Sequence, residues 1–404
     1  MNEYCVATYR LFDDTASFDK KAEGIAVGLT VGSWTDLPEA KKASMEKHLG
    51  RVLSVDVHDS DEPGKRYADI AIGYPDVNFS HDIAALLVTV FGKLSMDGRI
   101  KLIDLGWSTS FQQAFKGPKF GIEGVRSLLS VHDRPLLMSI FKSVIGHDLD
   151  GLRDQFYQQA LGGVDLIKDD EILFENPLTP IQDRVRTCME AARQAQEQTG
   201  KPLLYATNLT GPVFKLRDQA LRAIDAGANA LLFNVLGYGY DALHELSADP
   251  DISVPILAHP ALAGAMYPSI DQGISAKVLL GKLMRLAGAD LVLFPSPYGS
   301  VTMPKEDNHG IKAACLDDTL PMKTSFPVPS AGIHPALVPL IVEDFGIDVV
   351  INAGGGVHGH PMGTACGGKA FVQAIEAVMN NISLEQAASQ HQELQVALDR
   401  WGKK

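Results

Sequence analysis

The chain has 404 residues, of which 46% are hydrophobic, and its 36 Lys and Arg against 49 Asp and Glu give a formal charge of −13. No apolar run reaches the roughly 20 residues of a membrane-spanning helix, and no basic stripe suits nucleic acid, so we expect neither a membrane nor a nucleic acid as a partner. The four cysteines are widely spaced and form no CxxC pair, which favours a reduced, cytoplasmic protein.

Short alternating elements fill the first part of the chain. Alternating apolar residues predict strands over residues 4–12, 51–57, 67–74 and 100–105. Helical spacing predicts a helix over residues 17–27 and a second helix, capped by Ser80, before the last strand. The resulting order βαββαβ predicts a ferredoxin-like α+β domain over residues 1–117.

After Gly117 the pattern changes to apolar runs that alternate with segments of helical length. The runs begin near residues 135, 164, 202, 230, 255, 291, 325 and 348. Each is apolar nearly throughout, as in a parallel sheet covered on both faces. Eight such units predict a TIM (β/α)8 barrel over residues 118–404, with a helical tail at its end. An open doubly wound sheet is the alternative, but no Gly-rich phosphate loop follows the first run.

The second run ends in four consecutive ionisable residues, Lys168, Asp169, Asp170 and Glu171. The carboxyl ends of barrel strands carry the active site in this fold. Lys168 and Asp170 share one face of the strand, and two carboxylates there could hold a hard cation such as Mg²⁺. Two carboxylates alone make a sparse site, so a solvated strand end with internal salt bridges is an equal alternative.

Two other run ends carry residues that could meet a substrate. Lys142 follows the first run and His259 ends the fifth. Each has a structural alternative, a lysine at the barrel rim and a histidine held by hydrogen bonds, and the spacing does not separate the two.

Glycines follow the seventh and eighth runs, at Gly332 and at Gly354, Gly355 and Gly356. TIM barrels commonly bind phosphate there, because bare backbone can approach the oxygens. A tight turn would also need glycine, but the position in the barrel favours phosphate. His358 and His360 have HxH spacing, yet without an evident third ligand they do not predict a metal site.

Residues 162–171 read GGVDLIKDDE and resemble the GGxDxxKDDE signature of ribulose bisphosphate carboxylase (RuBisCO) large subunits and RuBisCO-like proteins. The segments SAGIH at 330–334 and GGG at 354–356 match further family motifs in order, and GSWT at 32–35 resembles the family's amino-terminal phosphate-side segment. The resemblance covers nearly the whole chain. It implies that CO2 carbamylates Lys168, and that the carbamate, Asp170 and Glu171 hold one Mg²⁺ per subunit.

The departures from carboxylases are as informative as the matches. Carboxylases have Lys-Pro-Lys where this chain has Lys142-Ser143-Val144, and a lysine in the loop that here spans residues 296–300 without one. Their Gly-Asn is replaced by Gly92-Lys93 and their His-Arg by His259-Pro260. The glutamate that precedes their Gly-Thr-Trp is absent, and its place falls near Gly28. The site therefore suits one phosphate instead of two, and we expect no carboxylation of ribulose bisphosphate.

These changes resemble the 2,3-diketo-5-methylthiopentyl-1-phosphate enolases of bacterial methionine salvage, most closely over residues 28–38, 91–95 and 136–142. The resemblance implies an isomerase that enolises a phosphorylated diketone with the help of Mg²⁺, with Lys93 as the base, in a homodimer that shares its active sites between subunits. The implied substrate contacts are Lys142, Lys168, Asp169, Asp170, Glu171, His259, Gly332, Gly354 and Gly355. Another RuBisCO-like isomerase acting on a methylthio-sugar phosphate, or a non-catalytic sugar-phosphate-binding barrel, are the alternatives.

Overall fold

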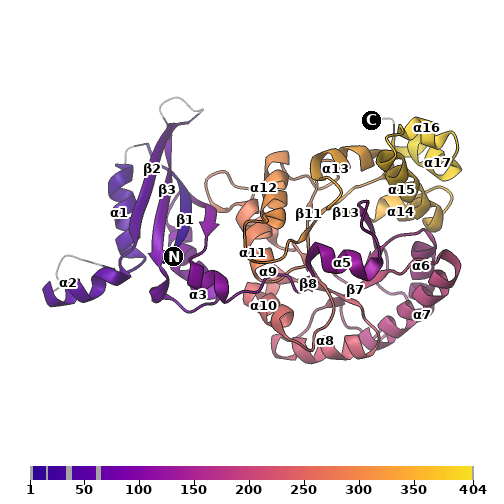
Figure 1. Ribbon diagram of the computed structural model, residues 1–404, viewed down its shortest axis with the longest axis horizontal. Helices are drawn as coiled ribbons and strands as arrows, with labels where there is room; N and C mark the ends of the chain where they lie inside the picture. The colour runs from indigo at the N-terminus through magenta and orange to yellow at the C-terminus, as the bar shows by residue number, and fades with distance from the viewer. Residues whose placement is uncertain (1–2, 15–16, 33–38, 61–64, 403–404) are drawn as a thin grey trace.

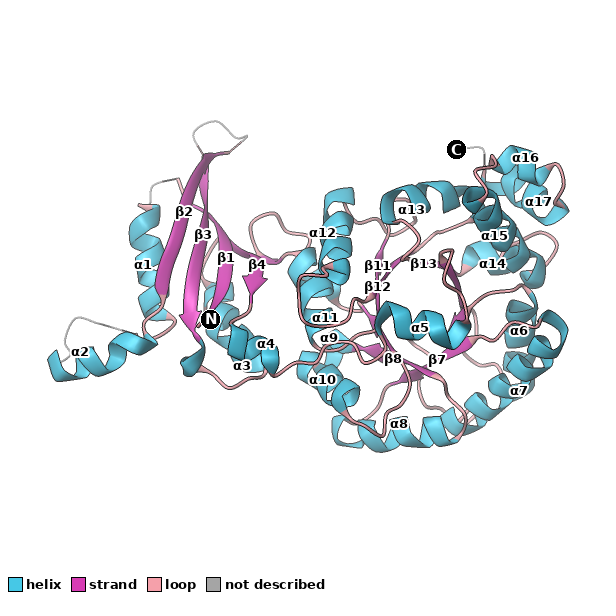
Figure 2. Ribbon diagram, in the orientation of Figure 1, coloured by secondary structure: helices cyan, strands magenta, loops and turns pink. Residues whose placement is uncertain are grey.

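The computed structural model describes residues 3–14, 17–32, 39–60 and 65–402. Two parts lie side by side, an antiparallel sheet with its helices and a barrel ringed by helices (Figure 1). Figure 2 shows that the strands of the barrel are enclosed by helices, whereas one face of the small sheet is open. Among the described residues, no helix is both long and apolar enough to cross a membrane.

The small sheet contains four strands from the first part of the chain. They are β1 (Tyr4–Phe12), β2 (Arg51–Asp59), β3 (Arg66–Pro75) and β4 (Ile100–Gly106). Their spatial order β4-β1-β3-β2, antiparallel throughout, is that of a ferredoxin-like domain and confirms the prediction. The inward side chains of β1 alternate strictly with half-buried ones, because helix α1 (Phe18–Gly28) covers one face. Helix α2 (Glu39–Met45) lies beyond α1.

The helix that Ser80 was expected to cap begins later than the sequence suggested. Helix α3 (Ile83–Leu87) is capped by Asp82, whose Oδ1 accepts a hydrogen bond from the Ala85 N–H at 2.6 Å. Ser80 donates its hydroxyl to Asp82 instead. A π-helical turn, Val88–Gly92, continues α3 toward Lys93. The prediction of a Ser80 cap was wrong because a carboxylate two residues further on reaches the free N–H groups.

The barrel has eight parallel strands in consecutive order, as predicted. They are β5 (Leu136–Ile140), β6 (Leu166–Lys168), β7 (Leu204–Leu209), β8 (Ala230–Asn234), β9 (Ile256–His259), β11 (Leu291–Pro295), β12 (Phe326–Ser330) and β13 (Val350–Ala353). Strand β13 pairs with β5, and the Asn352 amide donates to Ser330 Oγ at 2.8 Å across the remaining gap. The barrel is thus nearly closed.

Helices surround the barrel and one of them blocks its amino-terminal end. They are α5 (Gly121–Leu129), α6 (Leu149–Leu161), α7 (Ile181–Thr199), α8 (Leu216–Asp225), α9 (Val235–Tyr238), α10 (Tyr240–Ala248), α11 (Leu283–Leu286), α12 (Lys305–Leu316), α13 (Val338–Phe345), α14 (Gly355–His358), α15 (Thr364–Met379), α16 (Leu384–Ala388) and α17 (Gln392–Trp401). Helix α4 (Thr109–Gln113) lies beside α3 at the small sheet instead (Figure 2). Helix α5 crosses the opening of the barrel (Figure 1) and packs Ile122, Val125 and Leu129 against the first residues of the strands. Only the carboxyl ends of the strands therefore remain open.

A segment of the barrel region joins the small sheet. Strand β10 (Gly273–Ile274) pairs in parallel with β4 and adds a fifth strand. Asp104 of β4 binds Lys277 and Lys282 at 2.9 and 2.6 Å. Asp241 of α10 accepts hydrogen bonds from the first N–H groups of α3 at 2.9 and 2.7 Å. These contacts fix the small domain against the side of the barrel.

Candidate active site

Three predicted residues meet at the open end of the barrel. Lys168 is the last residue of β6, Lys142 follows β5, and His259 ends β9. Because β5 and β6 pair with Ile140 beside Lys168, the side chains after these strands lie close together. The structure therefore brings together Lys142, Lys168, Asp170, Glu171 and His259, as the sequence predicted for one end of a barrel.

Lys168 is held in an unusual setting for a lysine. Its side chain is 1% exposed, and its Nζ donates to the Asp169 carbonyl at 2.8 Å and lies 3.7 Å from Glu171 Oε2. Burial lowers the pKa of the Lys168 amine to about 8, although the neighbouring Glu171 and Asp170 oppose this shift. A sizeable fraction of the amine is therefore neutral, and nucleophilic, near physiological pH.

The two carboxylates are each engaged by a different cation or donor. Asp170 Oδ2 accepts a hydrogen bond from Lys142 Nζ at 2.8 Å. Glu171 Oε2 lies 3.5 Å from His259 Nε2. Burial acts to raise the pKa of Glu171, but the charge of Lys168 and hydrogen bonds bring it below its ordinary value. The Glu171 carboxylate is thus available as an anion to a cation at the open end of the barrel.

His259 is neutral in this setting. Burial and the charge of Lys168 hold its pKa well below the ordinary value. The Ala261 N–H donates to Nδ1 at 3.2 Å, which places the ring proton on Nε2, the atom that faces Glu171. His259 can therefore donate a hydrogen bond into the site without adding a charge.

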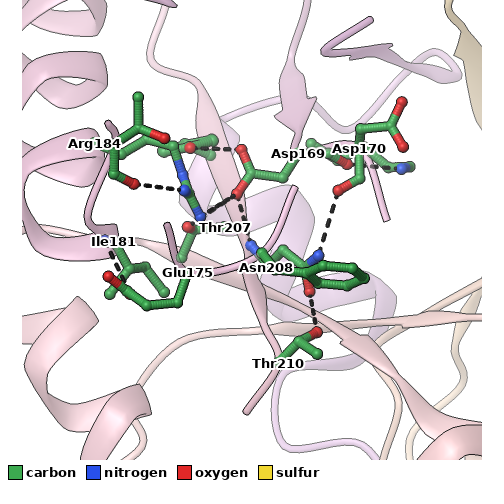
Figure 3. Close-up of polar contacts among 12 residues, drawn as sticks. Asp169, Asp170, Glu175, Ile181, Arg184, Thr207, Asn208 and Thr210 are labelled. Atoms are coloured by element: carbon green, nitrogen blue, oxygen red, sulfur yellow. Dashed lines mark hydrogen bonds and ion pairs between the residues drawn. The ribbon is translucent and has the colours of Figure 1, made fainter. Parts of the chain in front are cut away.

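The carboxylate of Asp169 points into the barrel wall, away from Asp170. Its buried carboxylate accepts hydrogen bonds from Tyr205 Oη at 2.6 Å, Thr207 Oγ1 at 3.2 Å and the Asn208 N–H at 2.8 Å. The guanidinium of Arg184, itself fully buried, is 3.2 Å away. Figure 3 shows this network in the barrel wall, with Asp169 and Asp170 pointing apart. The geometry favours a positioning role for Asp169 over the direct substrate contact that the resemblance implies.

Two asparagines near strand ends hold the backbone of Asp170 and Glu171, and neither was predicted from the sequence. Asn208 Nδ2 donates to the carbonyls of Asp170 and Glu171 at 3.3 and 2.9 Å. Asn234, which ends β8, donates to the Glu171 carbonyl at 3.2 Å. Their signal was available, because polar residues that end apolar barrel strands point to the site.

The residues present fit a magnesium ion if Lys168 is carbamylated. Within the described parts of the chain, no group of three or more His, Cys, Asp and Glu is arranged to hold a metal. Asp170 and Glu171 supply oxygen ligands of the kind that Mg²⁺ prefers, but too few of them. A carbamate on Lys168 would add two oxygens beyond Nζ, and Nζ already lies 3.7 Å from Glu171 Oε2. The lowered pKa of Lys168 favours the neutral amine that reacts with CO2.

Of the predicted phosphate glycines, Gly332, Gly355 and Gly356 border a cavity of about 560 Å³ at the same end of the barrel, together with the loop after β11. Gly332 has φ +71°, and a Cβ there would meet the Ser300 nitrogen at 2.6 Å. A Cβ on Gly355 would meet nothing within 4 Å, so this backbone faces open space. Gly354 lies against the stem of Lys142, which would be 3.3 Å from an added Cβ. Bare backbone thus adjoins the lysine–carboxylate cluster, as a phosphate site requires.

Lys93 is placed in the small domain, away from this cluster. It is exposed and borders a cavity of about 300 Å³ with Lys21, Gly28 and Asp97. All the residues around that cavity belong to the small domain, and α1, which forms one wall, lies on the side of the sheet far from the barrel (Figure 1). Residues 33–35 of the phosphate-side segment lie outside the described residues. A single chain therefore does not bring Lys93 to Lys168.

The fold and the site define an α/β-barrel protein with a lysine–carboxylate cluster and a glycine-lined cavity at the carboxyl ends of its strands. The sequence profile of the ribulose bisphosphate carboxylase large chain, catalytic domain, matches residues 121–401, and the chain belongs to this family. The suspected membership and the predicted fold class are confirmed.

The chain is similar over its full length to relatives and solved structures of that family. It is 53% identical to the 2,3-diketo-5-methylthiopentyl-1-phosphate enolase of Geobacillus kaustophilus, over 98% of each chain. A RuBisCO-like protein from Alicyclobacillus acidocaldarius superposes with a TM-score of 0.94 at 50% identity, over 100% of both chains. The dimeric archaeal RuBisCO of Hyperthermus butylicus superposes with a TM-score of 0.89 at 27% identity, over 100% of this chain and 96% of that one.

Proposed function

We propose that the chain is a 2,3-diketo-5-methylthiopentyl-1-phosphate enolase of methionine salvage. The observation that carries the proposal is the buried Lys168 beside Asp170 and Glu171, at the same end of the barrel as a glycine-lined cavity. A barrel that only bound phosphate would need no such cluster. Full-length identity of 53% to an enolase of that name supports the choice of substrate. We place the enzyme in the cytoplasm, because its four cysteines are unpaired.

The mechanism that we propose is metal-assisted enolisation. Carbamylated Lys168, Asp170 and Glu171 would hold Mg²⁺, which supplies polarisation of the adjacent carbonyls and so makes the C1 proton more acidic. The glycine backbone binds the phosphate, and the neutral His259 donates a hydrogen bond to a substrate oxygen. Lys142 Nζ, 2.8 Å from Asp170, orients that carboxylate and lies toward the substrate. Lys93 removes the proton from C1, and the enolate oxygen that results takes up a proton to give the enol.

The placement of Lys93 leads us to propose a homodimer in which each barrel is completed by the small domain of the other subunit. In a two-fold pair the same two surfaces meet twice, so two equivalent sites form. The archaeal RuBisCO of Hyperthermus butylicus is dimeric, which supports an assembly of two subunits.

Hybrid dimers test this sharing. A dimer of one Lys93→Ala subunit and one Lys168→Ala subunit holds one site with both lysines and one with neither. Random pairing of equal amounts should therefore restore about a quarter of wild-type turnover from two inactive proteins. Mass spectrometry of differently tagged subunits verifies the exchange, and each variant mixed with itself is the control. No recovery among verified hybrids would mean that each chain builds a complete site alone.

A substrate panel tests the proposed reaction. We expect enolisation of the diketone phosphate, no turnover of 5-methylthioribulose phosphate, and no incorporation of labelled CO2 into ribulose bisphosphate. Loop 296–300 lacks a lysine and Pro260 follows His259, so the new carboxylate and the second phosphate would face no counter-charge. An unpaired charge in a closed site costs several kcal/mol, or roughly a thousandfold in rate. Carboxylation at the rate of a true carboxylase, or preference for the methylthio-sugar phosphate, would overturn the assignment.

A further inference from the structure

The cavity beside the phosphate glycines has a wall that the family motifs do not include. Its lining comes from the loops after β11, β12 and β13 and from the end of α17, and includes Tyr298, Gly332, Gly355, Arg400 and Trp401. Helix α17 lies beside α14 and α15 at the rim of the barrel (Figure 1). The last helix of the chain thus reaches the place where bare backbone is open to a ligand.

The end of α17 is fixed onto the loop after β12. The Trp401 ring stacks on His334, with ring centroids 6.0 Å apart and planes at 11°. The Arg400 guanidinium carbon lies 5.3 Å from the centroid of the Trp401 ring. Further back, His360 Nε2 bonds to the Glu393 carbonyl at 2.9 Å and anchors the start of the helix. A cation held over an aromatic face in this way keeps its guanidinium edges free for an anion.

Charge points to Arg400 as the group that meets an anion here. Among the described residues that line the cavity, Arg400 is the one whose side chain carries a permanent positive charge. In residues 3–14, 17–32, 39–60 and 65–402, no carboxylate forms an ion pair with it. Lys142 is nearby, but its Nζ is bound to Asp170 at 2.8 Å, and it does not line the cavity. The loop at 296–300 offers no lysine.

We propose that Arg400 is a substrate-binding residue that neutralises the phosphate of the substrate, and that Trp401 positions it there. Backbone N–H groups of the glycine cradle would take some phosphate oxygens and the guanidinium the others, in the bidentate manner that suits phosphate. The inference rests on the proposed function, since it concerns the phosphate of that substrate.

Arg400→Gln tests the proposal through binding and turnover. We expect the KM for the diketone phosphate and the Kd for inorganic phosphate, measured calorimetrically, to rise about 10- to 100-fold, while kcat changes little, because uniform binding is lost. Arg400→Lys should recover part of the loss, since it keeps the charge but not the planar fork. Arg193→Gln is the matched control, because Arg193 is an exposed arginine of α7 that borders a different cavity.

A dephosphorylated diketone separates a phosphate contact from a general effect on the site. Its binding should be the same in wild type and Arg400→Gln. An unchanged KM and phosphate affinity in a folded Arg400→Gln, or an equal loss for the dephosphorylated ligand, would overturn the assignment of Arg400. If wild type failed to enolise the diketone phosphate but bound inorganic phosphate through Arg400, the proposed function would fail and the phosphate contact would stand.

Discussion

Replacing Lys93 with alanine is expected to slow exchange of the C1 proton by a factor of about 10² to 10⁴, because a positioned general base contributes that much to a proton transfer. Affinity for a stable substrate analogue should change little, since the base acts on the transition state. The Lys93 side chain is exposed and borders a cavity of the small domain, so it is accessible to a second subunit. The measurement is exchange at C1 in deuterated water with Mg²⁺, CO2 and the diketone phosphate present.

The competing explanation is that Lys93 only neutralises the phosphate. In that case Lys93→Ala would weaken binding and leave the exchange rate of the bound substrate nearly intact. Lys21→Ala is a matched control, because Lys21 borders the same cavity and is ion-paired with Asp13 at 2.5 Å. If C1 exchange survives in Lys93→Ala at close to the wild-type rate, Lys93 is not the base. Lys142 or the carbamate on Lys168 then becomes the leading candidate.

Activity is expected to depend on CO2 together with Mg²⁺, and to fall by a factor of about 10³ or more in Lys168→Ala. A metal that polarises a carbonyl stabilises the transition state by several kcal/mol, and Asp170 and Glu171 alone offer too few ligands to keep it. Labelled bicarbonate and mass spectrometry would detect the carbamate on Lys168. Lys201→Ala, which removes an exposed lysine at the other end of the barrel, should activate normally.

The pH dependence of activation follows from the pKa of Lys168. A carbamate forms from the neutral amine, and with a pKa of about 8 the neutral fraction falls as pH drops below 8. At a fixed concentration of dissolved CO2, activation should be about fivefold faster at pH 8 than at pH 7, with little further gain above pH 9. An ordinary lysine would continue to gain beyond pH 10. Full activity after rigorous removal of bicarbonate, with no carbamate detected, would contradict the proposal.

The local pattern of the sequence was enough to predict most of the strands of this protein. The alternation over residues 4–12 predicted β1 (Tyr4–Phe12) to the residue, and the eight apolar runs predicted the eight barrel strands. Both signals are local, because side-chain period and burial on two faces are written into consecutive residues. The segment from Lys168 to Glu171 was equally local, since the end of a single strand carries it. The carbamate and the metal stay predictions.

Other features depend on residues far apart in the chain, and only the tertiary structure decided them. The first N–H groups of α3 are bound by Asp241, 158 residues away, and β4 gains its neighbour β10 from the barrel region. Asp169 lies between Lys168 and Asp170 in the sequence, but its carboxylate points into the barrel wall. There the buried Arg184 and three hydrogen-bond donors bind it. Arg400 borders the same cavity as Gly332 and Gly355, and the stacking of Trp401 on His334 holds the end of α17 beside that cavity. No period or motif predicts such contacts, because the energy of a buried charge or a stacked ring depends on which distant groups the fold brings within a few ångströms.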